Sequence, residues 1–220
     1  MKSIHNAFAT LTLLAAASAQ AATVLPTSYD MPNGHGLASG GIYNYWDRNY
    51  TGSGNGQIDG DMLSGGLGDL TDGVIATQSW EAEENIEGSG PYVGWVFLDP
   101  VITFNFAEVV QFAQLTVWHD DANGNGNVKP PQAFVVTVGG QSQTFAIADP
   151  ATDAPFASTL VLAPGMAGNS LQLQILRRDP WLMVSEVSFQ TAAVPEPATW
   201  ALWALGAAVL LQARRRGVAA

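Results

Sequence analysis

The chain has 220 residues, of which 8 are basic and 19 are acidic, so its net charge at pH 7 is −11. Nucleic acid is therefore excluded as a partner, because phosphate binding needs a basic surface. Cysteine is absent, so a folded domain must be stabilised by its core, with or without help from a metal. Glycine (23) and proline (12) are frequent and charged residues make up only 12%, which is typical of a loop-rich all-β protein.

The first 21 residues have the three zones of a secretory signal peptide. Lys2 is a positive start, residues 7–17 are apolar, and Ala19-Gln20-Ala21 has the small residues of a cleavage site. This order predicts a signal peptide over residues 1–21, cleavage after Ala21 and an exported mature chain. The alternative is a buried N-terminal helix.

Short segments rich in β-branched and aromatic residues recur along the middle of the chain, most regularly from residue 92 onward. They predict strands at 41–46, 92–98, 101–106, 112–118, 133–138, 143–147, 158–162, 170–176 and 183–189. Gly139-Gly140 predicts a tight turn between two of them. In residues 171–175 Leu or Ile alternates with Gln, which predicts one buried and one solvated face. No amphipathic helix is predicted within residues 22–193, so we expect a β-sandwich there.

Several motifs follow one another in a distinctive order. They are Leu70-Thr71-Asp72-Gly73, Gly94-Trp95, residues 102–106, residues 134–138 and residues 184–189. In this order the stretch 70–189 resembles the galactose-binding-domain-like jelly roll, a group that includes discoidin and many carbohydrate-binding modules. The resemblance implies an all-β fold, a jelly-roll β-sandwich, with its core at residues 70–189 and an affinity for carbohydrate.

The resemblance also implies a structural calcium ion between the Leu70–Gly73 turn and the last strand. Asp72 and Glu186 would supply carboxylates, and Leu70 a backbone carbonyl. Calcium takes several oxygen ligands, so such a set is chemically suitable. The alternative is that Asp72 hydrogen-bonds within its own turn and that Glu186 is a solvated strand residue.

A second stretch, Asp121–Gly126, matches the first half of a calcium-binding loop. Its twelfth position is Gln132 instead of Glu, and Pro130-Pro131 prevents an exiting helix, so an EF-hand is excluded. The favoured interpretation is a polar connector whose Asn and Gly residues adopt left-handed turn conformations. A looser calcium loop with Asp120 and Asp121 as ligands is the alternative.

Carbohydrate sites combine exposed aromatic faces with arginine and carboxylate groups. Candidate ligand-binding residues near the predicted strand ends are Trp80, Tyr92, Arg177 and Trp181, with Arg178 and Asp179 beside them. The alternative is that the aromatic residues pack in the core and that the two arginines belong to a charged loop.

Catalytic residues are harder to assign. The chain has no cysteine nucleophile and no Gly-x-Ser-x-Gly motif. Outside the first segment, His35 and His119 are too few for a histidine-based metal site. The acidic residues of 81–87 are interpreted as a solvated loop and not as a glycosidase pair. We therefore predict a non-enzymatic protein, with a hydrolase as the less favoured alternative.

The last 27 residues have three parts: Val194-Pro195-Glu196-Pro197, an apolar run over 198–211, and the cluster Arg214, Arg215 and Arg216. The prolines favour an extended segment. The apolar run would span about 21 Å as a helix, against about 30 Å of hydrocarbon. Extended to residue 213, it predicts a transmembrane helix over 198–213 with the arginines on the cytoplasmic side; an interfacial helix is the alternative.

This tail resembles the PEP-CTERM sorting signal. The resemblance implies that exosortase, a membrane-embedded enzyme, recognises residues 194–220 and cleaves near the Pro-Glu-Pro motif. The protein would then occupy the inner membrane transiently and reach the cell surface or the extracellular matrix. Between the two processed ends, once Lys2, Glu196 and the three tail arginines are left out, residues 22–193 keep 4 basic and 18 acidic residues, a net charge of −14.

The predicted function is that of an exported surface or matrix protein that binds carbohydrate or exopolysaccharide. A purely structural matrix protein with no specific ligand is the alternative.

Overall fold

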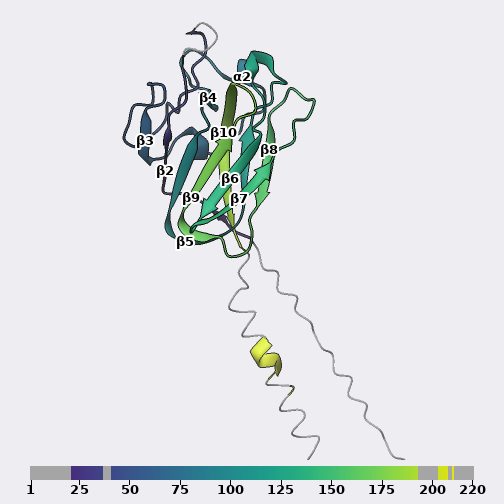
Figure 1. Cartoon of the computed structure of the whole chain (residues 1–220). Helices are drawn as coiled ribbons and strands as arrows, with labels where there is room; N and C mark the ends of the chain where they lie inside the picture. Colours follow the sequence, from purple (N-terminus) through teal and green to yellow (C-terminus); the bar gives the residue numbers. More distant parts are fainter. Residues whose placement is uncertain (1–20, 37–40, 193–202, 208–209, 211–220) are drawn as a thin grey trace, which may run out of the picture. The chain divides into compact units, whose positions relative to one another are not determined.

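The computed structural model describes residues 21–36, 41–192, 203–207 and 210 (Figure 1). Residues 21–192 form one compact unit, and the terminal segments 1–20 and 193–220 group separately. In the second unit, residues 203–207 and 210 are helical. In the described parts of the chain, no helix combines the length and the apolar character needed to cross a membrane. Residues 1–20 of the expected signal peptide, the expected sorting motif and most of the expected span lie outside the described residues.

The compact unit is built from antiparallel β-strands. Its strands are β1 (Thr23–Val24), β2 (Ser28–Pro32), β3 (Met62–Gly66), β4 (Val93–Val96), β5 (Val101–His119), β6 (Ala133–Val138), β7 (Gln141–Ala146), β8 (Phe156–Val161), β9 (Ala167–Leu176) and β10 (Trp181–Thr191). Its named helical segments are short: η1 (Asp69–Thr71), α2 (Trp80–Glu83) and η2 (Asn125–Asn127).

The strands form two layers that share β5. One layer has the order β3-β2-β5-β9-β6-β7, and in the other β10 lies between β5 and the edge strands β1 and β4, with β8 beyond β5. The first part of β5, Val101–Asn105, pairs with β2 and β9, whereas Gln114–His119 pairs with β10 and β8. The predicted strands 101–106 and 112–118 are therefore two halves of one strand that bends from one layer into the other. The result is the predicted all-β sandwich, with an arrangement consistent with a jelly roll.

The main core lies between the two layers. Leu171, Leu173 and Ile175 of β9 are fully buried, which confirms the predicted alternation. Phe104 and Phe189 come from opposite layers, and their rings pack edge-to-face at 4.8 Å. Burial of each such side chain stabilises the fold by about 1.5–3 kcal/mol, so this core holds the sandwich together without disulfides.

Most predicted strands from residue 92 onward are confirmed, and Gly139 and Gly140 form the predicted turn between β6 and β7, both with positive φ. The predicted strand at 41–46 is wrong. This segment is irregular, because its backbone bonds to separate segments instead of to one neighbouring strand: the Asn44 N–H donates to the Asn85 carbonyl and the Tyr45 N–H to the His35 carbonyl. Tyr45 is buried in a second apolar cluster, against which Tyr43 packs.

The second cluster lies at the end of the sandwich that carries α2. Its buried members include Tyr45, Trp80, Tyr92 and Met183, with Trp181 packed against them. A glycine is required beside it in β4: a Cβ on Gly94 would lie 2.5 Å from the Met183 sulfur. This close contact lets the irregular segment before residue 46 cover the outer edge of β4, where Gly94 and Tyr45 share a backbone hydrogen bond of 3.0 Å.

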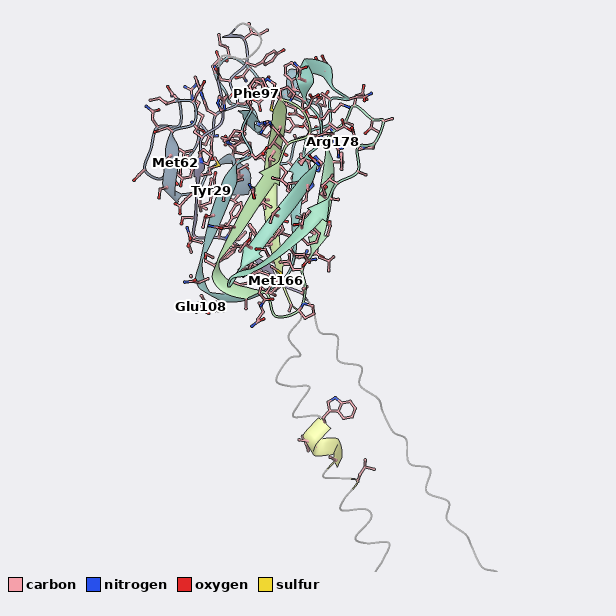
Figure 2. All side chains as sticks on the ribbon, in the orientation of Figure 1. Tyr29, Met62, Phe97, Glu108, Met166 and Arg178 are labelled. Carbon is pink, nitrogen blue, oxygen red and sulfur yellow. The ribbon has the colours of Figure 1, made fainter. Side chains whose placement is uncertain are left out.

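Both ends of the compact unit leave from one edge of the sandwich. β1 pairs with the end of β10, Thr23 opposite Gln190. The backbone N–H of Ala192 donates to the carbonyl of Gln111 at 2.8 Å, and the neighbouring Phe112 N–H donates to Met166. Figure 2 shows Met166 and Glu108 at this end, and Phe97 and Arg178 toward the other.

Candidate functional site

A shallow hollow opens between the loop that follows β4 and the loop that joins β9 to β10. Its volume is about 320 Å³, and it is lined by Phe97, Asp99, Arg177, Arg178, Asp179 and Pro180. The two loops are joined by a hydrogen bond of 2.9 Å from the backbone N–H of Phe97 to the carbonyl of Pro180. The hollow is therefore built on strand ends of a rigid sandwich.

Phe97 is the most unusual residue of the hollow. Its φ is +55°, in the left-handed region that a bulky side chain seldom adopts, and its side chain is 73% exposed. Such a conformation costs about 1–3 kcal/mol, and the exposed ring repays none of it by core burial. The strain instead keeps an aromatic face in solvent above the hollow.

Arg177 and Asp99 form a fixed pair on the floor of the hollow. One oxygen of Asp99, Oδ1, accepts hydrogen bonds from the Arg177 backbone N–H at 3.0 Å and from Arg177 Nη1 at 2.8 Å. Because a guanidinium has five N–H donors, this pair leaves several donors and one carboxylate oxygen available to a ligand.

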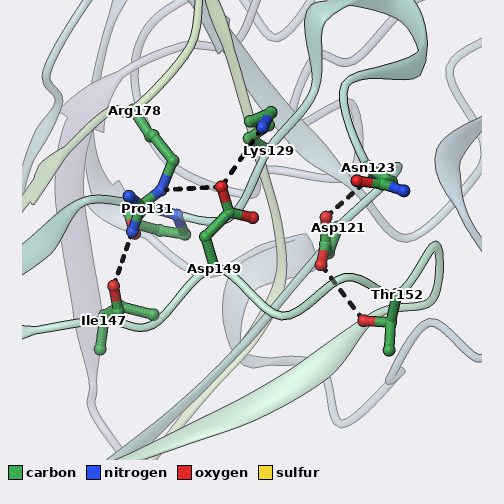
Figure 3. A network of polar contacts seen from close by, with 8 residues as sticks. All are labelled: Asp121, Asn123, Lys129, Pro131, Ile147, Asp149, Thr152 and Arg178. Carbon is green, nitrogen blue, oxygen red and sulfur yellow. Dashed lines mark hydrogen bonds and ion pairs between the residues drawn. The ribbon is translucent and has the colours of Figure 1, made fainter.

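Arg178 is directed into a separate polar network (Figure 3). Its Nη2 donates to the carbonyl of Ile147 at 2.6 Å and to that of Pro131 at 3.4 Å. Its Nε lies 3.8 Å from Asp149 Oδ2, which also pairs with Lys129 Nζ at 3.2 Å. The network braces the β9–β10 loop against the segments before β6 and after β7, and the single negative charge of Asp149 is shared between Arg178 and Lys129.

The predicted ligand residues fall into two groups. Arg177 lines the hollow, whereas Trp181 is half-buried and packs on Tyr45 with ring centroids 5.2 Å apart. Trp80 and Tyr92 are 6% and 0% exposed in the second cluster. No face of Trp80 or Tyr92 is open to a sugar, so both are removed from the ligand set as a correction.

Sequence reasoning missed Phe97 and Asp99. Phe97 lies inside the stretch 92–98 that was predicted as one strand. The signal that could have identified it is the Asp99-Pro100 turn two residues later, because β4 already ends at Val96 and leaves the ring on a loop.

The Leu70–Gly73 turn and β10 lie side by side, as the resemblance implied. The Gly73 N–H donates to Glu186 Oε2 at 3.0 Å. Asp72 Oδ1 accepts from the Val74 N–H at 2.8 Å, so Asp72 hydrogen-bonds within its own turn, as the alternative prediction said. The Leu70 side chain is part of the main core. Glu186 is only 7% exposed, so its interpretation as a solvated residue is wrong. Burial raises the pKa of its carboxyl to about 7.

Two further buried carboxylates, Asp47 and Asp69, flank this turn. The Asp69 backbone N–H donates to Asp47 Oδ1 at 3.0 Å, and Tyr29 donates its hydroxyl to Asp47 Oδ2. Burial, and then the nearby charge of Asp47, raises the pKa of Asp69 to about 7. Asp69 Oδ2 and Thr71 Oγ1 are buried and have no hydrogen-bond partner.

These orphaned oxygens fit calcium in part. Within residues 21–36 and 41–192, however, no three His, Cys, Asp or Glu side chains are grouped so that they could hold one metal ion. Calcium here would therefore rely on backbone carbonyls such as that of Leu70 together with single carboxylate oxygens, and it stays a prediction.

The Asp121–Gly126 stretch adopts the connector conformation. Asp121 Oδ1 accepts from the Asn123 N–H at 2.9 Å, and Asp121 Oδ2 accepts from Thr152 Oγ1 at 3.2 Å (Figure 3). Asn123, Gly124 and Gly126 have positive φ, as predicted. Asp120 Oδ2 accepts from the backbone N–H of Trp80 at 2.9 Å, at the start of α2, whereas its buried Oδ1 has no hydrogen-bond partner among the described residues.

Two further titratable groups, Glu84 and His119, are buried, and the burial of Glu84 differs from expectation. Glu84, expected in a solvated loop, is buried and accepts from the Tyr92 N–H at 2.7 Å, and burial raises its pKa to about 8. His119 is fully buried, its Nε2 lies 2.8 Å from Ser158 Oγ, and burial lowers its pKa to about 4. This His–Ser pair is sealed between β5 and β8, away from any substrate.

The family model of the discoidin domain-containing receptor 1/2, DS-like domain, matches residues 26–191. The chain belongs to this family. A second model, the PEP-CTERM protein-sorting motif, matches residues 193–216. Both resemblances drawn from the sequence are thereby confirmed. The motif marks this DS-like protein for export and sorting to the cell envelope and implies processing by exosortase. Its residues Val194–Pro197 and Arg214–Arg216 lie outside the described part of the chain.

The DS-like domain is also similar to solved structures. The F5/8 type C domain of a Bacteroides fragilis protein shares 10% identity over 79% of this chain and 98% of that chain, with a TM-score of 0.45. A family 32 carbohydrate-binding module of a GH31 protein, bound to GalNAc, shares 18% identity over 56% of this chain and 86% of that chain, with a TM-score of 0.36. The family 32 module of C. perfringens NanJ, in complex with galactose, shares 6% identity over 45% of this chain and 75% of that chain, with a TM-score of 0.33. No curated protein matches the chain.

Proposed function

We propose that the protein is an exported, non-enzymatic surface protein that binds carbohydrate in the hollow beside Phe97. The observation that carries the proposal is a strained, 73% exposed aromatic ring next to the fixed Arg177–Asp99 pair. An aromatic face packs against the C–H face of a sugar ring, and an adjacent donor and acceptor bind neighbouring hydroxyls. A few placed polar groups beside an apolar surface are the usual composition of a small-ligand site.

We further propose that exosortase cleaves near Pro195-Glu196-Pro197 after transient anchoring by residues 198–213, and that the mature domain associates with exopolysaccharide at the cell surface or in the matrix. Comparison of the mature mass in cells that carry the natural motif and in cells with all three residues replaced by alanine tests the cleavage. An uncleaved tail in the normal strain contradicts it.

The binding proposal is tested with the intact chain in a neutral detergent on a glycan array, followed by calorimetry on the sugars that bind. Galactose and GalNAc are the first ligands to measure. Phe97→Ala is expected to weaken binding about tenfold, because truncation of a central aromatic anchor typically costs more than 1 kcal/mol.

Val109→Ala is the matched control, since Val109 is an equally exposed apolar residue on the bend of β5. An array on which no glycan binds favours the alternative of a structural matrix protein without a ligand.

Calcium at the turn beside β10 is proposed as a stabilising ion and not as part of the binding site. The unpartnered Asp69 Oδ2 and Thr71 Oγ1 support it, because both residues belong to the turn whose Gly73 N–H donates to Glu186.

A further inference from the structure

We infer that two copies of this chain associate through the free edge of β7, with the two β7 strands antiparallel and related by a twofold axis at Thr144. The association does not depend on the proposed carbohydrate function. It follows from how the edges of the two sheets are covered and from where the charges of the domain lie.

Several sheet edges are covered by other parts of the domain. At β3, Ser53 and Ser64 exchange backbone hydrogen bonds of 2.8 and 3.0 Å. At β4, the Gly94 N–H donates to the Tyr45 carbonyl at 3.0 Å. The edge strand β1 has two residues and offers little to pair with. Such devices keep a sheet edge from pairing with another chain.

The edge of β8 is covered at its end by a side chain of β7. The Gln143 amide donates to the Val161 carbonyl at 3.3 Å and accepts from the Ala163 N–H at 2.9 Å. The side chain thus makes the two bonds that a neighbouring strand would make there.

The free edge of β7 differs, because it stays open along all six residues. Within the described part of the chain, β7 pairs only with β6. Directly after β7, the Ile147 N–H donates to the Gln132 carbonyl on the β6 side at 3.0 Å. Backbone groups of alternate strand residues point to opposite sides. The N–H and C=O groups of Ser142, Thr144 and Ala146 therefore point to the free edge.

The β7 edge is also where charge opposes a second copy least. Residues 22–193 carry a net charge of −14, so two copies repel each other over most of their surface. Residues 132–148, however, contain no Asp, Glu, Lys or Arg and no proline, the residues that commonly protect a free edge. Since this edge has no carboxylate to attract a basic peptide, a second copy is the partner that fits it.

A twofold axis at Thr144 makes the two edges self-complementary. Thr144 of one copy would lie opposite Thr144 of the other, and Ser142 opposite Ala146, so all three outward-directed residues of each strand would have partners. Phe145 and Ile147 pack against the main core but stay partly exposed at this open side. The second strand would cover both side chains, and their burial would favour association.

The antiparallel pairing would place the two hollows at opposite ends of the dimer. β7 starts after Gly139, which lies beside Ala167, and runs to Ile147, whose carbonyl accepts from Arg178. Figure 2 shows Met166 and Arg178 toward opposite ends of the domain. If each domain binds sugar as proposed above, the dimer would link two glycans that approach from opposite sides.

Cross-linking tests the pairing directly. The chain has no cysteine, so Thr144→Cys introduces a single thiol. A hydrogen-bonded antiparallel pair has Cα atoms about 5.5 Å apart, within the range of about 4.4–6.8 Å that a disulfide spans. The intact variant in a neutral detergent, oxidised by copper phenanthroline, is expected to shift to the mass of a dimer on a non-reducing gel. Gln172→Cys, exposed on the same sheet face but on β9, is the matched control and should stay monomeric.

Charge reversal of the pairing is the second test. Thr144→Lys places two ammonium groups opposite each other and is expected to abolish the dimer of the intact chain in sedimentation velocity. Gln172→Lys adds the same charge away from the edge and should leave the dimer unchanged. Both positions are exposed, so the melting temperatures of the two variants should match that of the natural chain.

The inference is wrong if Thr144→Cys cross-links no better than Gln172→Cys, or if Thr144→Lys stays dimeric. If both lysine variants are monomeric, the copies associate through the sheet face and not through the edge. A natural chain that is monomeric at every concentration also contradicts the inference and leaves the edge to a strand of another protein. None of these outcomes bears on sugar binding, which the glycan array measures.

Discussion

Carboxylates occur in two settings in this domain. Around the turn at Leu70 and around α2, Asp47, Asp69, Glu84, Asp120 and Glu186 are buried and have no cation among the described residues within ion-pair distance. Around the hollow, exposed or half-exposed carboxylates are paired with three of the four basic residues of residues 22–193. If stability alone decided the placement, the basic residues would lie beside the buried carboxylates, since exposed ion pairs contribute at most about 1 kcal/mol. Of the two arginines in the lining, Arg177 therefore stands where a ligand could use it, whereas Arg178 braces the loop.

The pH dependence of stability is the largest expected effect, because the contributions of several buried carboxyl groups add together. Burial raises the pKa values of Asp69 and Glu186 to about 7 and of Glu84 to about 8. The folded state then binds more protons than the unfolded state, whose carboxyl pKa values are near 4. The free energy of unfolding should therefore fall as pH rises.

The clearest window for this effect is from about pH 6.5 to pH 8. Below pH 6.5 the lowered pKa of His119, about 4, acts in the opposite direction. Denaturant titrations of the intact chain across the window measure the fall, and Glu84→Gln should make it shallower. A stability that rises through this window would contradict the assignment of these carboxyls as uncompensated.

Asp120→Ala should have the next largest effect. It leaves the buried backbone N–H of Trp80 and the hydroxyl of Ser79 without their acceptor, so the free energy of unfolding is expected to fall by about 1–3 kcal/mol. Asp149→Ala, which breaks the exposed pairs with Lys129 and Arg178, should cost at most about 1 kcal/mol. Urea unfolding of both variants compares the buried and the exposed carboxylates directly. Equal losses of unfolding free energy would show that the two settings do not differ in their contribution to stability.

A bound calcium ion would compensate the charge of the buried carboxylates near the Leu70–Gly73 turn. If an ion binds between the Leu70–Gly73 turn and Glu186, a chelator should lower the melting temperature by about 2–4 °C for each kcal/mol of binding lost, and Glu186→Gln should abolish this response. Melting curves with and without the chelator measure it. Curves that coincide would show that burial alone governs these carboxyls.

Phe97→Gly should have the smallest effect on stability. Glycine relieves the strain at φ +55°, and this gain roughly offsets the greater flexibility of the unfolded chain, about 1 kcal/mol each. Sugar affinity should nevertheless fall about tenfold. Unfolding and binding measured on the same preparation separate the two roles, and a large loss of stability would show that the ring belongs to the core.

The sequence predicts the second half of the sandwich well because alternation in strands such as β9 is local. It misses β2 and β3, whose Asp, Pro and Gly residues disfavour strands and which are held by their neighbours in the sheet. It also cannot reveal that β5 is continuous through Ala107 and Glu108. At the candidate site, Arg177 was predicted from its chemistry and lines the hollow, and its contact with a ligand stays a prediction. Trp80 and Tyr92 were misplaced because burial by distant segments has no local signal.

The pairing of β1 with the end of β10 has a consequence for ligand access. The domain begins and ends beside Gln111 and Met166, whereas the hollow lies toward the other end (Figure 2). The residues at which the chain enters and leaves the domain therefore take no part in the mouth of the hollow, and a ligand can approach it without meeting them.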